Sequence, residues 1–298
     1  MRLLINEDAN SVSKKCAEYI AAKINDAHPT AETPFVMATP TGNTAKGVYA
    51  HLCTLFKTGK VSFEHVVTFN IDEYVALPRL NPNSQHSYMW DNFFRVVDIR
   101  RENVNFLDGN ASDLDAECAR YEAAIAASGG IDLAFFSTGR AGHVARNEPG
   151  SSLKSRTRPK TLDDDTMEQL AVRWARQPAT AANGSGDGGG GGGGDSDMPV
   201  PKVTLTMGVG TLLESKEVVV LFSGSARARA LEAALEFGVN HMFPVSAFQR
   251  HPRVLFLCDE DATLELRVKT VKYFEGLAKT TTFAAAEDTE PTSKRQKK

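Results

Sequence analysis

Residues 66–75 read Val66-Val67-Thr68-Phe69-Asn70-Ile71-Asp72-Glu73-Tyr74-Val75. The run is apolar and rich in β-branched side chains, which is typical of a buried strand, and it ends in two adjacent carboxylates, Asp72 and Glu73. Ligands in open parallel sheets gather outside the carboxyl ends of the strands. These carboxylates are therefore candidates for chemistry. The alternative is a pair of solvated acids that open a turn before Pro78.

The composition is that of an ordinary globular protein. Of the 298 residues, 42% are hydrophobic and 24% are charged, which is enough to bury a sizeable core. A net charge of −3 gives no broad positive field for nucleic acid or an anionic membrane, although a local cluster could hold phosphate. We therefore expect a small-molecule partner, and neither nucleic acid nor a membrane.

The sequence carries no sign of export, membrane insertion or metal binding. The apolar run near the N-terminus is too short for a signal peptide, and no stretch approaches the roughly 20 apolar residues of a membrane helix. Four cysteines lie far apart, without a C-x-x-C pair or histidines spaced for zinc: Cys16, Cys53, Cys118 and Cys258. We expect free thiols, no metal and a cytoplasmic location.

Strand-like and helix-like segments alternate along most of the chain. Apolar runs predict strands near residues 3–5, 35–38, 66–71, 131–136, 203–206, 218–222 and 254–257, with helices between most of them. This alternation predicts the α/β class, with one parallel sheet sandwiched by helices. We expect a single domain over residues 1–280, a flexible, disordered glycine-rich insertion at 183–198 that can bury nothing, and a disordered tail at 281–298.

A loop of small residues joins the second expected strand to the helix that follows it. The loop reads Pro40-Thr41-Gly42-Asn43-Thr44, and the helix is expected over 45–56. Such a loop points backbone N–H groups and the positive end of a helix dipole at whatever lies above it, as in many phosphate sites. A plain turn capped by a threonine fits the motif equally well.

The strand expected at 131–136 runs into a loop with two candidate catalytic side chains. His143 and Glu148 lie beyond the strand end and form a plausible acid and base pair, although a lone histidine is more often structural. Residues 151–161 then become basic and rich in hydroxyl groups. That segment predicts either a solvated loop or an anion site.

Several stretches together resemble glucosamine-6-phosphate deaminases. In chain order they are residues 40–42, 61–75 and 142–149, then Gly208-Val209-Gly210-Thr211-Leu212-Leu213 and Val239-Asn240-His241-Met242. The likeness runs from residue 1 to about residue 277 and leaves out the glycine-rich insertion and the tail. It implies a Rossmann-like parallel sheet and a homo-hexamer that converts glucosamine 6-phosphate to fructose 6-phosphate and ammonia in amino-sugar and N-acetylglucosamine catabolism, without metal or organic cofactor.

The resemblance also implies roles for individual residues. Asp72 matches the carboxylate that moves a proton from C2 to C1, and His143, supported by Glu148, matches the acid/base of ring opening. The matching substrate-phosphate ligands are Thr41, Gly42, Asn43, Thr44, Arg227 and Arg173. Arg227 stands where the family usually has a lysine, and an arginine keeps the charge and adds a fork suited to phosphate. Arg173 matches a cation on a lid.

A second anion site follows from the same resemblance. In bacterial members of the family, N-acetylglucosamine 6-phosphate activates the enzyme from a subunit interface. Its ligands match Ser151, Ser152, Arg158, Lys160, Thr161 and Tyr273. The basic segment is therefore an expected allosteric site.

The loop of the catalytic histidine departs from the family pattern. The family has Gly-Gly at Phe136-Ser137, Asn-Asp at Arg140-Ala141, and Phe at Arg146. Loss of the Asp at Ala141 is expected to impair the enzyme, because removing the orienting carboxylate from a comparable triad costs orders of magnitude in rate. Phe136 is expected to crowd the sugar.

Three functions are consistent with these residues. The first is a working deaminase. The second is a non-catalytic sugar-phosphate binder. Changes clustered in one catalytic loop favour this function more than changes scattered along the chain would. The third is a 6-phosphogluconolactonase-like enzyme, which shares the fold but lacks the block Asn70-Ile71-Asp72-Glu73-Tyr74.

Overall fold

The computed structural model describes residues 1–175 and 200–287. Within these ranges the strands are β1 (Arg2–Asn6), β2 (Phe35–Thr39), β3 (Val66–Asn70), β4 (Asp72–Tyr74), β5 (Val104–Asn105), β6 (Leu133–Ser137), β7 (Arg158–Thr161), β8 (Val203–Thr206), β9 (Glu217–Phe222) and β10 (Val254–Asp259). The alternation of strands and helices confirms the predicted α/β class.

The helices lie between most of these strands. They are α1 (Ala9–Ala27), α2 (Asn43–Lys57), α3 (Gln85–Met89), α4 (Leu114–Ala127), α5 (Asp164–Ala175), α6 (Val209–Leu213), α7 (Ala228–Leu235) and α8 (Val268–Glu287), with shorter π or 3₁₀ segments η1 (Trp90–Phe94), η2 (Arg101–Asn103), η3 (Ser225–Arg227), η4 (Pro244–Arg250) and η5 (Asp261–Thr263). Side-chain caps fix the starts of two long helices, because Asp8 accepts from the N–H of Ser11 and Asp113 from the N–H of Ala116.

The main sheet has seven strands in the order β1-β10-β9-β6-β2-β3-β5. Every pairing in it is parallel. The central strands are buried on both faces, as in residues 133–136 and 218–222, which is why they read as unbroken apolar runs. A single parallel sheet therefore brings the carboxyl ends of all seven strands to one edge.

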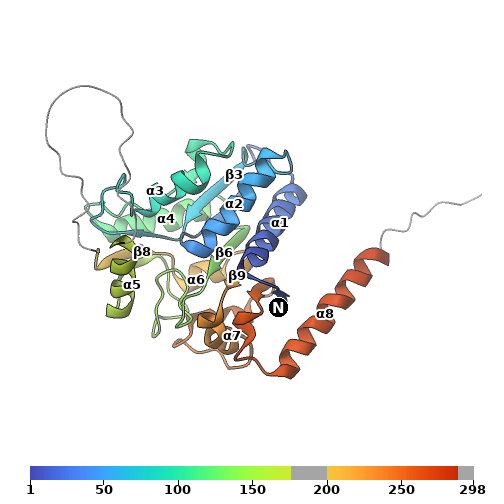
Figure 1. The fold of residues 1–298 in the computed structure, drawn as a ribbon. Helices are drawn as coiled ribbons and strands as arrows, with labels where there is room; N and C mark the ends of the chain where they lie inside the picture. The colour runs from blue at the N-terminus through green and yellow to red at the C-terminus, as the bar shows by residue number, and fades with distance from the viewer. Residues whose placement is uncertain (176–199, 288–298) are drawn as a thin grey trace, which may run out of the picture.

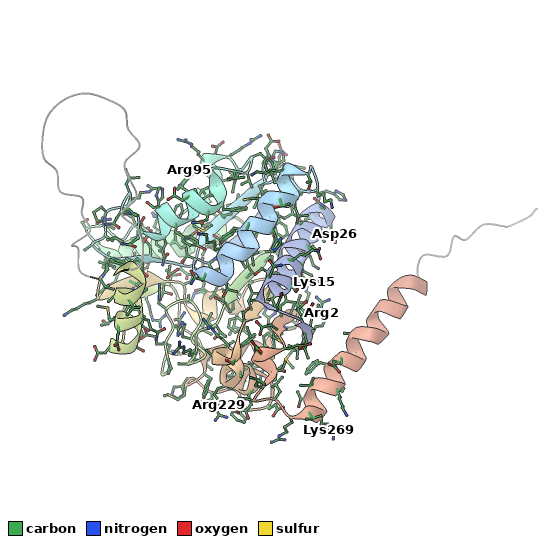
Figure 2. All side chains as sticks on the ribbon, viewed as in Figure 1. Arg2, Lys15, Asp26, Arg95, Arg229 and Lys269 are labelled. Carbon is green, nitrogen blue, oxygen red and sulfur yellow. The ribbon has the colours of Figure 1, made fainter. Side chains whose placement is uncertain are left out.

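Helices cover both faces of this sheet (Figure 1). One core packs α1, α2 and η1 against the sheet and includes Tyr49, Phe93 and Phe135. The other packs α4, α6 and α7 against the opposite face and includes Tyr121 and Phe136. Charged side chains of the outer helix surfaces, such as Lys15, Asp26 and Arg95, are exposed (Figure 2). The four cysteines are buried free thiols, as expected.

A second, antiparallel sheet was not foreseen. It has the order β4-β8-β7, so the prediction that residues 203–206 join one parallel sheet is wrong. The chain leaves the main sheet after β3, and β4 then pairs with β8, with Asp72 opposite Thr206. Helix α5 lies against this small sheet and closes a separate apolar cluster of Tyr74, Leu77, Leu162 and Leu170. The small sheet therefore holds Asp72 in a hydrogen-bonded strand outside the main sheet.

The end of the chain differs from the expectation in one respect. Helix α8 continues to Glu287, beyond the start of the expected tail at residue 281, and it projects away from the body of the molecule (Figure 1). The expected insertion at 183–198 and residues 288–298 lie outside the described residues. Within residues 1–175 and 200–287, no helix is long and apolar enough to cross a membrane.

Candidate active site

Four neighbouring strands of the main sheet deliver the candidate site residues. β9, β6, β2 and β3 are adjacent in the sheet. They lead, respectively, to Arg227, His143, the loop of residues 40–44 and Asp72. Since the carboxyl ends of parallel strands meet at one edge, these residues converge there although they are far apart in sequence. A backbone hydrogen bond from Ile71 N to Thr39 O, 3.1 Å long, joins two of the loops directly.

Asp72 is held by donors from two other segments of the chain. Its side chain is 5% exposed, and its Oδ2 accepts hydrogen bonds from Nε of Arg146 at 2.8 Å and from Nε2 of Gln85 at 3.2 Å. No described side chain or backbone N–H donates to Oδ1. The carboxylate therefore has one oxygen bound by the protein and one left for a substrate.

The Arg146 guanidinium is itself enclosed. The side chain of Arg146 is 15% exposed, and its Nη2 donates to the Tyr74 hydroxyl at 2.8 Å. The guanidinium carbon, Cζ, lies 5.4 Å from the centroid of the Tyr74 ring. Burial acts to lower the pKa of Arg146, but Tyr74 and Asp72 outweigh it and hold this pKa above its ordinary value. Arg146 is therefore a permanent cation beside Asp72.

Glu73 points to a different set of partners. Its carboxylate accepts from the backbone N–H groups of Tyr74 (2.8 Å), Gln85 (3.1 Å) and His86 (2.9 Å), and the last two belong to the first turn of α3. Burial raises the pKa of Glu73 to about 7, against the opposing effect of these three donors. Glu73 anchors the start of α3 next to Asp72.

Helix α3 connects Asp72 to the candidate phosphate loop. The Tyr88 hydroxyl donates to the carbonyl oxygen of Gly42 at 2.6 Å, and Gln85, one turn earlier, donates to Asp72. Gly42 has a φ of 111°, a conformation that side chains rarely adopt, and α2 begins at the next residue. The first N–H groups of α2 have no partner within the helix, so this end of α2, which α3 joins to Asp72, can bind an anion.

The other predicted phosphate ligands surround this loop to different degrees. Thr41 and Thr44 are half-buried and Asn43 is exposed. Arg227 ends the turn η3 and is half-buried, and burial, together with the charge of Arg140, lowers its pKa while Asp259 opposes the shift. Arg173 lies on α5, and its side chain is outside the described set.

His143 lies in a compact turn after β6. The N–H of Gly142 donates to the carbonyl of Gly139 at 3.0 Å, and a side chain at Gly139 would collide with the imidazole, because its Cβ would lie 1.9 Å from Cε1 of His143. Burial, with the charges of Arg146 and Arg227 added, lowers the pKa of His143 to about 4. The imidazole is therefore neutral near pH 7.

Glu148 does not pair with His143 in the described residues. Its carboxylate accepts from the backbone N–H of Asp163 at 3.2 Å and is also hydrogen-bonded by the Thr166 side chain, and burial raises its pKa. The turn Val144–Asn147 separates the two residues and directs Glu148 toward the start of α5. Its position favours a role in holding the α5 segment over a direct bond to the histidine.

Phe136 is part of the core. It is fully buried and packs against Phe248 with ring centroids 5.1 Å apart. The expectation that it crowds the sugar is therefore not supported, because its ring is buried in the layer between the sheet and η4.

The predicted allosteric residues are only partly gathered. Ser151, Ser152, Arg158, Lys160 and Thr161 lie on β7 or just before it, and Nη1 of Arg158 donates to Oδ1 of Asn147 at 2.8 Å. The Ser151 hydroxyl is buried without a partner among the described residues. Tyr273 lies on the projecting helix α8, where it is 61% exposed, so this chain alone does not bring it to the other five.

Sequence reasoning missed Gln85 and the pairing of Arg146 with Asp72. Gln85 follows Ser84, a helix-capping residue whose hydroxyl accepts from the N–H of Ser87, and that cap was the available signal that this segment begins a helix near the site. Arg146 was noted as a departure in a catalytic loop. Its partner lies 74 residues earlier and left no local trace.

No group of three or more His, Cys, Asp and Glu side chains in residues 1–175 and 200–287 is arranged to hold a metal ion. The polar groups gathered here are donors from hydroxyl, N–H and guanidinium groups, and the carboxylates as acceptors. These suit a phosphorylated, polyhydroxylated molecule.

The chain matches known proteins over most of its length. The family model described as glucosamine-6-phosphate isomerases/6-phosphogluconolactonase matches residues 7–169. A glucosamine-6-phosphate deaminase from Drosophila melanogaster is 50% identical over 277 residues, which cover 93% of this chain and 94% of that protein. Glucosamine-6-phosphate deaminase 1 from Homo sapiens is 49% identical over 281 residues, covering 93% and 89%, respectively.

Solved structures show the same relationship. A monomeric glucosamine-6-phosphate deaminase superimposes with a TM-score of 0.77 at 34% identity, over 89% of this chain and all of that one. A 6-phosphogluconolactonase from Trypanosoma cruzi has a TM-score of 0.65 at 15% identity, over 89% of this chain and 96% of that one, and shares the fold alone. The extent and identity of these matches show that the chain belongs to the glucosamine-6-phosphate deaminase family.

Proposed function

We propose that this protein isomerises and deaminates glucosamine 6-phosphate to fructose 6-phosphate and ammonia. The observation that carries the proposal is the link through α3, in which Gln85 donates to the Asp72 carboxylate and Tyr88 donates to the loop that we propose binds the phosphate. A sugar phosphate needs both features, one for its carbon skeleton and one for its phosphate. The family relationship supplies the amino sugar as the substrate.

Asp72 is proposed to carry the proton of the isomerisation. It takes the proton from C2 of the open-chain sugar and returns it to C1, which leaves an imine at C2. Water then adds to that imine and releases ammonia, so that the net reaction consumes one water. Burial of the carboxylate keeps bulk water from competing for the proton.

His143 is proposed to act first, in opening the sugar ring. A pKa of about 4 makes it a neutral imidazole near pH 7, able to take a proton from the hydroxyl at C1 while its other nitrogen carries a proton. Glu148 is proposed to support this loop through its bonds to the α5 segment.

The phosphate is proposed to bind at the start of α2. Thr41, Gly42, Asn43 and Thr44 are proposed to supply N–H and side-chain donors there, with Arg227 and Arg173 as the cations. The half-buried position of Arg227 favours this role, because a partly desolvated guanidinium interacts strongly with a dianion.

Assembly and regulation are proposed on the same basis. We propose a homo-hexamer that takes part in N-acetylglucosamine catabolism and binds N-acetylglucosamine 6-phosphate as an activator at residues 151–161. The buried, unpartnered hydroxyl of Ser151 and the exposed Tyr273 on α8 support an interface site that a second copy completes. Size-exclusion chromatography with light scattering, with and without this ligand, tests the assembly.

Ammonia release from glucosamine 6-phosphate tests the activity. Asp72→Asn keeps the shape of the side chain but removes its basicity, and we expect at least a 10³-fold loss of kcat. The matched control is Asp91→Asn, at an exposed carboxylate that also pairs with an arginine, and it should retain wild-type rates. Absence of Asp72-dependent turnover at high enzyme concentration would refute the proposal, and thermal stabilisation by the substrate without turnover would identify a sugar-phosphate binder instead.

A further inference from the structure

A buried arginine contacts the carboxylate that is proposed to move the proton. Arg146 donates through Nε to Oδ2 of Asp72, and Gln85 donates to the same oxygen. Two donors on one side of the carboxylate fix the orientation of its plane, because a partial turn about the Cβ–Cγ bond would stretch both hydrogen bonds. The roles of the two oxygens are therefore distinct.

The position of Arg146 is itself fixed. Its backbone N–H donates to Oγ1 of Thr206 at 3.1 Å, and Thr206 lies opposite Asp72 in the pairing of β4 with β8. Its Nη2 is bonded to the Tyr74 hydroxyl, on the same strand as Asp72. The preceding residue, Ala145, has a φ of 50°, which a residue with a side chain adopts only when its surroundings enforce it. The loop is held in a strained conformation that delivers the guanidinium to Asp72.

Resting on the proposed function, we propose that Arg146 is a positioning residue that reserves Oδ1 of Asp72 for proton transfer between C2 and C1 of the sugar. The proton leaves C2 for Oδ1 and goes from Oδ1 to C1, while Oδ2 stays bonded to Arg146 and Gln85. One oxygen thus faces both carbons in turn, and the transferred proton has little opportunity to exchange with water.

Charge alone would give the opposite effect. The titratable and charged groups that interact with Asp72 in the described residues are Arg146, Glu73 on β4 and Tyr121 on α4, and only Arg146 is cationic. A cation makes a carboxylate a weaker base, so removing it would speed proton abstraction if basicity limited the rate. If the position of the Asp72 carboxylate limits the rate, removing the Arg146 guanidinium slows the reaction, since a misplacement of the carboxylate by about 1 Å costs up to 10²-fold.

The test compares Arg146→Met and Arg146→Lys with the wild type in ammonia release from glucosamine 6-phosphate. Methionine fills similar space without a donor, and lysine restores a charge and one donor. For Arg146→Met we expect kcat to fall about 10- to 100-fold with KM within about threefold, because the phosphate site is separate. Arg146→Lys should recover part of the loss. Arg95→Met, at an exposed arginine paired with Asp91, is the control.

The deuterium content of the product is a second readout. It depends on the position of the Asp72 carboxylate and not on the amount of folded protein. In D2O, deuterium at C1 of the product reports how often the transferred proton exchanges with solvent. We expect this fraction to rise in Arg146→Met and to return toward the wild-type value in Arg146→Lys. An unchanged fraction in Arg146→Met overturns the proposal.

A crystal structure of Arg146→Met separates this inference from the proposed function. If the wild type releases no ammonia, the function fails, and the variant structure still decides whether Arg146 positions Asp72. A carboxylate that turns away from its Gln85 partner in the variant supports the positioning role. A carboxylate that keeps the wild-type orientation overturns it.

Discussion

Restoring a carboxylate two residues before His143 should increase the activity of this protein. The relevant variant is Ala141→Asp, at an exposed position in the turn that holds the imidazole. In the wild type, burial and the charges of Arg146 and Arg227 bring the pKa of His143 from 6.5 to about 4. This difference corresponds to a loss of about 3 kcal/mol in proton affinity.

A weak base is a poor catalyst for ring opening at neutral pH. Base strength contributes most when the pKa of the group lies near the pH of the reaction. A carboxylate within about 4–6 Å favours the charged imidazole and raises such a pKa by about 1–3 units. The Ala141→Asp variant should therefore bring His143 back toward its ordinary range and increase the rate of ring opening at pH 7 about tenfold or more.

Two measurements on the same protein check this reasoning. NMR titration of the imidazole of His143 follows its pKa, and ammonia release from glucosamine 6-phosphate follows turnover. Ala141→Asn has nearly the same shape without the charge and serves as the matched control. An Ala141→Asp variant whose His143 titration moves upward while its rate stays equal to that of Ala141→Asn would refute the link between the basicity of His143 and ring opening.

Three further predictions concern the buried groups around the site. Glu73 has a pKa of about 7 against 4.5 when unfolded, so its contribution to stability is present below pH 4.5 and is lost as the pH rises through 7; Glu73→Gln should remove ~2 kcal/mol of the change in stability between pH 5 and pH 7.5, measured by urea denaturation at these two pH values. Gly139→Ala should displace the imidazole of His143 and lower kcat about 10- to 100-fold while the melting temperature changes little; a normal kcat would show that the ring can shift without cost. Phe136→Ala should lower the free energy of unfolding by about 3–5 kcal/mol through the cavity left against Phe248, and a stability loss below ~1 kcal/mol in the same denaturation assay would contradict its place in the core.

The main sheet was predictable because its strands are local features. The run 133–136 is apolar throughout, so its burial follows from composition alone. β8 was assigned to the wrong sheet because the pairing of a strand is not a local feature. The sequence Val203-Thr204-Leu205-Thr206 indicates a strand, but its partners β4 and β7 are set by contacts between distant segments. A short strand pattern carries no information about which edge it joins.

The same distinction holds for the site. Strand-end logic brought out Asp72, His143 and the 40–44 loop, because parallel strands with their loops converge by construction. It did not resolve the orientation of side chains within a loop. Ala145 has a strained backbone, and a turn follows it. Arg146 is thereby directed to Asp72, whereas Glu148, two residues later, is directed to the start of α5.

The charge of Arg146 acts on the two proposed steps in opposite directions. It lowers the proton affinity of His143 and so opposes ring opening, while its hydrogen bond fixes Asp72 for the transfer from C2 to C1. Since one substitution changes both, the total rate of Arg146→Met alone cannot identify the limiting step. Exchange of the C2 proton with solvent reports only the step at Asp72, and the dependence of kcat on Ala141→Asp reports only the step at His143. The double variant, Ala141→Asp with Arg146→Met, should therefore be non-additive in kcat, because both substitutions change the step at His143, while its exchange of the C2 proton should equal that of Arg146→Met alone.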